Sequence, residues 1–86
     1  MRNAMLKRIK NAIPSFFEKI AMFHETKFHT WRGQLIVKIK GKKSKEYLAY
    51  LVDEISKSLF FLGAKRSLPA ARKEISVAVR ARIAMC

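Results

Sequence analysis

The sequence contains one cysteine, two prolines, three glycines and six acidic side chains among its 86 residues. Because the single cysteine, Cys86, excludes an intramolecular disulfide, we expect a reducing intracellular compartment, either the cytoplasm or an organelle matrix. No apolar run approaches the length of about 20 residues that a membrane-spanning helix requires. The first residues also lack the uninterrupted apolar segment of a secretory signal. These absences argue against a membrane-spanning or secreted protein.

Motifs for catalysis, metal binding and nucleotide binding are also missing. His24 and His29 are the only histidines, and with one distant cysteine they do not supply the four ligands of a structural zinc site. The loop at residues 41–45 lacks the glycine spacing of a Walker loop. The chain has neither an aromatic RNP signature nor a KH-type Gly-x-x-Gly loop. We predict a non-enzymatic protein with no cofactor, no metal and no small-molecule substrate.

Positive charge and apolar residues are abundant. Lysine and arginine number 19, which gives a formal net charge of +13, and half of the residues are hydrophobic. The apolar content is sufficient for a folded core and argues against disorder, so we predict one domain over residues 1–86. A charge of this size repels itself and favours an anionic partner, which is nucleic acid, an acidic lipid surface or an acidic protein. Nucleic acid is the commonest of the three.

The N-terminal segment, residues 1–26, shows helical periodicity. Apolar residues recur every three or four positions, at Leu6, Ile9, Ile13, Phe16, Ile20 and Phe23. Pro14 interrupts this pattern, and we favour two segments, one ending near Asn11 and one starting at Pro14, over a single kinked helix. A helix packed on the core is favoured over a basic arm that lies on a membrane or a phosphate backbone.

Residues 27–41 are predicted to form strands. Leu35, Val37 and Ile39 alternate with residues that include Lys38 and Lys40, as in a sheet with one buried face. Arg32-Gly33 is predicted to be a tight hairpin turn, and the alternative is one long strand with a bulge at the glycine. We favour the hairpin because a sheet of only two strands is marginally stable.

Residues 44–63 give the clearest helical pattern. Ser44 suits the N-cap and Gly63 suits the left-handed position after the last turn. The predicted buried stripe is formed by Leu48, Leu51, Val52, Ile55, Leu59 and Leu62. This segment is predicted to be the central amphipathic helix of the domain.

Residues 74–85 are predicted to form a second strand region. The basic connection before it contains Pro69, which is expected to exclude a continuous helix through that connection. One predicted face contains Ile75, Val77, Val79, Ala81, Ile83 and Met85. The expected fold is therefore a small two-layer α+β domain, with N-terminal helices followed by a β(β)αβ core over residues 27–86 and one helix on a two- or three-stranded sheet. A right-handed parallel crossover is expected, and antiparallel arrangements stay open.

Charge is distributed unevenly along the chain. The net charge is +4 in residues 1–28, +6 in 29–45, −2 in 46–63 and +5 in 64–86. If the acidic central helix covers one face of the sheet, Lys38, Lys40, Arg80 and Arg82 are expected to project from the other face, with the loop residues Lys42, Lys43 and Lys45 at one end of it. Such a basic face suits phosphate backbones. The candidate residues for nucleic acid or an acidic partner are Arg32, Lys38, Lys40, Lys42, Lys43, Lys45, Lys65, Arg66, Arg72, Lys73, Arg80 and Arg82.

Three aromatic residues are further candidates. Trp31 either stacks on an unpaired base or belongs to the core, and the core is favoured because tryptophan is highly buried on average. Phe60 and Phe61 lie outside the main stripe of the predicted helix. They are covered either by the N-terminal helix or by a partner protein.

Three functional hypotheses follow. The first is a basic protein that contacts RNA or DNA phosphates as a subunit of a larger assembly. The second is a small adaptor or inhibitor, of viral type, that binds a nucleic-acid-processing enzyme through its basic face and exposed aromatics. The third, a peripheral membrane protein that uses the N-terminal helix, is the least favoured. In length, charge and element order the chain resembles small ribosomal and ribonucleoprotein subunits in general, and the resemblance carries no specific motif.

Overall fold

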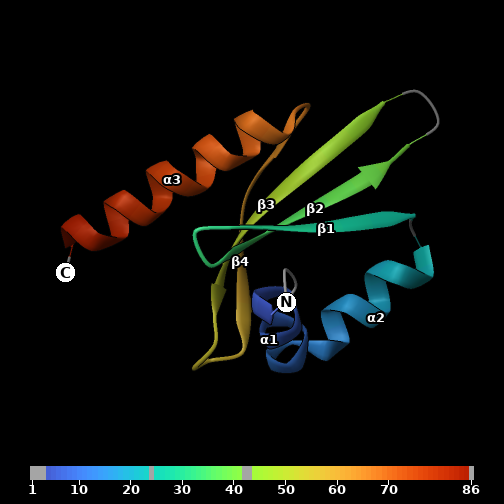
Figure 1. Ribbon diagram of the computed structural model, residues 1–86, viewed down its shortest axis with the longest axis horizontal. Helices are drawn as coiled ribbons and strands as arrows, with labels where there is room; N and C mark the ends of the chain where they lie inside the picture. The colour runs from blue at the N-terminus through green and yellow to red at the C-terminus, as the bar shows by residue number, and fades with distance from the viewer. Residues whose placement is uncertain (1–3, 24, 42–43, 86) are drawn as a thin grey trace.

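A computed structural model describes residues 4–23, 25–41 and 44–85 and shows three helices and a four-stranded sheet (Figure 1). The elements follow the order α1 (Ala4–Ala12), α2 (Pro14–Phe23), β1 (Thr26–Trp31), β2 (Gln34–Lys40), β3 (Lys45–Asp53), β4 (Ser58–Lys65) and α3 (Leu68–Met85). Each strand pairs in antiparallel fashion with the next one along the chain, so the spatial order is β1-β2-β3-β4.

Helices cover both faces of this sheet. α1 and α2 lie on one side and α3 lies on the other (Figure 1). The prediction of an α+β domain is confirmed. The predicted two-layer β(β)αβ order is wrong, because the molecule has three layers, an antiparallel sheet and no helix between its strands in the described residues.

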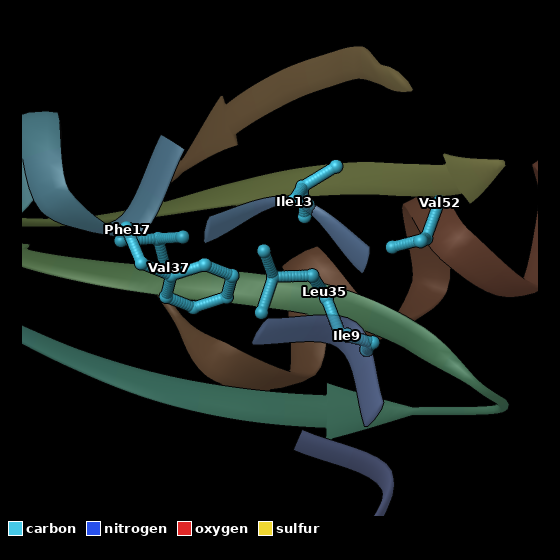
Figure 2. Close-up of a cluster of buried hydrophobic side chains, with 6 residues drawn as sticks. All are labelled: Ile9, Ile13, Phe17, Leu35, Val37 and Val52. Atoms are coloured by element: carbon cyan, nitrogen blue, oxygen red, sulfur yellow. The ribbon is translucent and has the colours of Figure 1, made fainter. Parts of the chain in front are cut away.

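The N-terminal segment folds as two helices that meet at Pro14, as predicted. The N–H of Ile13 still donates to the carbonyl of Ile9 at 3.0 Å, and Pro14 is the first residue of α2, where its missing N–H costs no helical bond. Ile9, Ile13 and Phe17 are buried against the sheet (Figure 2). The predicted stripe is therefore used in the core from Leu6 to Ile20, and Figure 2 shows Ile9, Ile13 and Phe17 beside Leu35, Val37 and Val52.

The predicted hairpin at Arg32-Gly33 is confirmed. Both residues have positive φ angles, 51° and 78°, which is the backbone of a type I′ turn. A two-residue turn of this type fixes the register, so Lys27 pairs with Lys38 and Thr30 pairs with Leu35.

The prediction of a helix over residues 44–63 is wrong. This segment forms β3 and β4, joined by a turn at residues 54–57, and Ile55 is 98% exposed at its tip. Because helices cover both faces of the sheet, β3 is apolar on both sides. Its run from Tyr47 to Val52 therefore lacks the alternation of apolar and polar residues that marks a strand with one solvent-exposed face. Ser44 precedes β3 and Gly63 lies within β4, so neither residue caps a helix.

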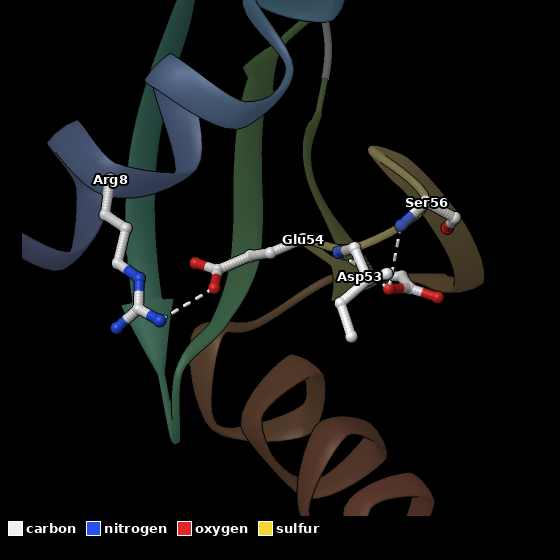
Figure 3. Close-up of polar contacts among 5 residues, drawn as sticks. Arg8, Asp53, Glu54 and Ser56 are labelled. Carbon is white, nitrogen blue, oxygen red and sulfur yellow. Dashed lines mark hydrogen bonds and ion pairs between the residues drawn. The ribbon is translucent and has the colours of Figure 1, made fainter.

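The turn between β3 and β4 uses side-chain chemistry instead of glycine or proline. Oδ1 of Asp53 accepts hydrogen bonds from the N–H groups of Ile55 and Ser56, at 3.1 and 3.2 Å (Figure 3). Such side-chain-to-backbone bonds are a recognised way for aspartate to form a turn. Lys57 then takes a positive φ of 56°, a conformation that normally favours glycine or asparagine.

The prediction of a strand over residues 74–85 is also wrong, because this region belongs to α3. The hydroxyl of Ser67 caps the helix by accepting from the N–H of Ala70 at 3.3 Å. Pro69 falls in the first turn, where proline is tolerated. Ala71 and Ile75 are fully buried against Ile36 and Ala49 of the sheet.

Among the described helices, none has the length and apolar character needed to cross a membrane.

Candidate functional site

Four lysines converge on the α3 side of the sheet, at the end nearest the β2–β3 connection. Lys27 is directly opposite Lys38, and Lys40 is directly opposite Lys45. Figure 1 shows α3 running from the middle of the sheet away from this end. Together with Glu25 and Thr26, the four lysines line a cavity of about 180 Å³. We call these four residues the basic surface.

The basic surface places like charges next to one another, with the carboxylate of Glu25 in the lining of the same cavity. Like charges directly opposite each other on neighbouring strands destabilise a sheet. Within the described residues the two ion pairs are Arg8–Glu54 at 2.8 Å and Lys65–Glu74 at 3.0 Å, and neither involves a lysine of this surface. An anionic ligand would relieve this repulsion.

Two rings adjoin the lysines. Tyr47 is half-buried, packs in part against the cluster under α3, and lies directly opposite Lys38 on β2 and Lys65 on β4. Nζ of Lys38 lies 5.9 Å from the centre of the Tyr47 ring, and the imidazole of His29 lies 6.4 Å from it, centre to centre. Burial, followed by the charges of Lys38, Arg72 and Lys27, lowers the pKa of His29. The imidazole is therefore held neutral beside the cations.

Trp31 lies further along the same face, and its contacts agree with the core interpretation. Its Nε1–H donates to the hydroxyl of Ser76 at 3.0 Å, and it packs against the cluster under α3. The guanidinium carbon of Arg72 lies 4.9 Å from the ring centre, and that of Arg32 lies 5.8 Å from it. The buried Nε of Arg72 has no hydrogen-bond partner among the described residues. The ring is thus already engaged by two cations.

Other predicted basic residues are spread over the molecule. Lys42 and Lys43 lie outside the described residues. Arg66 follows β4 and Lys73 lies on α3, and both are exposed. The prediction that Arg80 and Arg82 share a strand face with Lys38 and Lys40 is wrong, because both arginines are on α3.

The opposite end of the sheet has balanced charge. A cavity of about 350 Å³ there is lined by residues that include Arg8, Arg82, Asp53 and Glu54. Figure 3 shows Arg8 reaching Glu54 across the strands. Hydrogen bonds from Ser56 are the main cause that lowers the pKa of Asp53, and the charge of Arg82 adds to the effect. Arg32 also lies at this end, in the β1–β2 turn.

Phe60 and Phe61 lie on β4, an edge strand of the sheet, and remain 55% and 58% exposed. Consecutive residues of a strand point to opposite faces, so the two rings do not form one patch. The Phe61 ring lies 5.5 Å from Tyr50, which in turn contacts Phe16 of α2 at 5.3 Å between ring centres. The N-terminal helices therefore reach the neighbour of Phe61 and leave more than half of Phe61 uncovered.

Lys27 and Tyr47 were missed as candidate site residues. A signal for Lys27 was present, because a two-residue turn at Arg32-Gly33 pairs position 27 with position 38. Tyr47 had no comparable signal while its segment was interpreted as helix.

Comparison with protein-family models, curated proteins and solved structures gives no match to this chain. Within the described residues, no group of three or more histidine, cysteine, aspartate or glutamate side chains is placed to hold a metal ion.

Proposed function

We propose that this chain is a non-enzymatic protein that binds RNA or DNA through phosphate contacts, as a subunit of a larger assembly. The observation that carries the proposal is the pair of lysine–lysine cross-strand neighbours, Lys27 with Lys38 and Lys40 with Lys45. Such pairs cost folding stability and concentrate positive charge on an uncovered part of the sheet. Polyanion binding gives this arrangement a function, because phosphates neutralise the lysines and release counterions.

Titration of labelled nucleic acid at several salt concentrations tests the proposal. We expect affinity to fall as salt rises, with a log–log slope of about −0.7 to −0.9 per neutralised phosphate. Replacing Lys38 and Lys40 by glutamate should weaken binding to all sequences alike, because phosphate contacts do not read bases.

The matched control is a double charge reversal at Lys7 and Lys19, exposed residues of α1 and α2 on the other side of the sheet. It changes the net charge by the same amount and should reduce affinity much less. Equal losses in both variants would assign binding to net charge alone. Absence of binding at low salt would reject the proposal.

A second candidate function is that of an adaptor for an acidic protein. It is supported by the exposure of Phe60 and Phe61 on the edge strand β4, since an unpaired strand edge accepts a strand from a partner. The net charge of +13 opposes a second copy of this chain and favours an acidic partner.

Capture of partners from the source cell, with and without nuclease, separates the two functions. Partners lost on nuclease treatment indicate nucleic acid, whereas one protein retained after treatment indicates the adaptor. In the second case, Phe61→Ser should weaken capture and leave the melting temperature almost unchanged, because more than half of the ring is exposed. Undiminished capture by Phe61→Ser would exclude Phe61 from the contact.

A further inference from the structure

Tyr47 has the surroundings of a stacking site. It lies in a row across all four strands, in the order Lys27, Lys38, Tyr47, Lys65, in which the other members are lysines and Lys65 is paired with Glu74 of α3 at 3.0 Å. Neighbouring strands are about 4.8 Å apart, so every member of the row is within reach of one short stretch of a phosphate backbone. An aromatic ring among cations is the arrangement by which proteins bind unpaired bases.

The contacts of the two nearby rings, Trp31 and His29, favour Tyr47 as the ring that stacks on a base. Trp31 is engaged by Ser76 and by the Arg72 guanidinium, so its indole is used within the protein. His29 lies 6.4 Å from Tyr47, with an interplanar angle of 46°, and the causes that lower its pKa keep it uncharged. The imidazole is tilted against the phenol, so it adds a second, neutral ring beside Tyr47 without adding charge.

We propose that the basic surface binds single-stranded nucleic acid and that one unpaired base stacks on Tyr47, a proposal that rests on the function proposed above. In a duplex the bases are stacked on one another, so the Tyr47 ring would add nothing to duplex binding. The side chains around the ring are lysines, which contact phosphates and do not select a sequence.

The test measures fluorescence anisotropy with three labelled nucleic-acid probes of about 15 nucleotides, a length within the site sizes of single-strand binding proteins. They are a single strand, the matching duplex and a fully abasic single strand, which keeps the phosphates and lacks the bases. The single strand is tested both as RNA and as DNA, and the one that binds more tightly indicates which nucleic acid the protein prefers. Wild type should bind the single strand more tightly than the other two probes.

Tyr47→Leu should weaken single-strand binding by about 5- to 150-fold, the equivalent of about 1–3 kcal/mol of stacking on one base. It should leave binding to the duplex and to the abasic strand unchanged. Tyr47→Phe keeps the ring and should retain most of the wild-type affinity. Circular dichroism and thermal melting show whether each variant is folded.

The outcomes separate this inference from the function on which it rests. If wild type binds the single strand, the duplex and the abasic strand equally, stacking is rejected and phosphate binding stands. If no probe binds at low salt, both proposals fail. The abasic comparison uses wild-type protein, so it decides the question even if Tyr47→Leu does not fold.

Discussion

Lys27 on β1 and Lys38 on β2 occupy directly opposite positions in the sheet, and neither takes part in the ion pairs of the described residues. The charge of each contributes to lowering the pKa of His29 on the same face. Selection for stability alone would favour an opposite charge at one of the two positions. If the basic surface binds an anion, as we propose, binding would relieve this repulsion and stabilise the sheet.

Lys27→Glu should stabilise the free protein. It replaces a repulsive cross-strand pair with an attractive one, and we expect a gain of about 0.2–1 kcal/mol in the free energy of unfolding. Chemical denaturation measures this gain, and Lys19→Glu on α2 is the charge-matched control. The same change should weaken nucleic-acid binding. A less stable Lys27→Glu protein would contradict the repulsion.

Ile75→Ala and Val77→Ala should differ strongly in their effects. Both residues belong to α3, but Ile75 is fully buried against the sheet, whereas Val77 is 56% exposed. We expect a loss of about 2–5 kcal/mol for Ile75→Ala and a change within about 0.5 kcal/mol for Val77→Ala, both measured by denaturation. In a strand the two side chains would share one face, so equal losses would argue against the helix.

Lys57→Gly should stabilise the protein, because glycine adopts the positive φ of 56° without the steric cost that a side chain carries. That cost is about 1–2 kcal/mol, and the greater flexibility of glycine in the unfolded chain offsets part of it. Thermal melting should therefore show a small rise. The control is Lys73→Gly at an exposed position inside α3, where glycine should lower the free energy of unfolding by about 1 kcal/mol. A lower melting temperature for Lys57→Gly would contradict the turn.

The stability of the free protein should fall as the pH drops below about 6.5, in part because of His29. Its pKa is lowered in the folded state, so the unfolded chain binds the proton more readily below the ordinary value of about 6.5. Stability contributed by the neutral imidazole is present above that value and is lost as the pH falls through the folded pKa. His29→Gln should flatten the pH dependence, measured by denaturation at each pH. An identical slope in both proteins would exclude His29 as the cause.

The first half of the fold could be predicted because its signals are local. Pro14 marks a helix boundary by removing an N–H, and Arg32-Gly33 suits a type I′ turn. β3 gives no such signal, since burial on both faces removes the alternation, and its turn depends on Asp53 and on a strained Lys57. Only the packing of the finished domain distinguishes this apolar run from one side of a helix.

α3 was misinterpreted for a related reason. Ile75, Val77 and Val79 alternate along the sequence, yet only Ile75 is fully buried, since α3 presents positions three and four apart to the sheet. Of the candidate lysines, Lys38 and Lys40 lie on β2 as expected, and Lys45 lies directly opposite Lys40 on β3. The grouping with Arg80 and Arg82 failed together with the strand prediction.

The order of the sheet also bears on how the chain folds. Every pair of neighbouring strands is consecutive in the sequence, so the sheet can grow by successive hairpins without bringing together distant parts of the chain. Hairpins form in about 1–10 μs, and domains rich in local contacts fold faster than those that depend on distant pairing. We therefore expect rapid, single-exponential refolding. The β1–β2 hairpin, with its preorganised turn, is the natural starting point, and the two terminal regions dock as the sheet is completed.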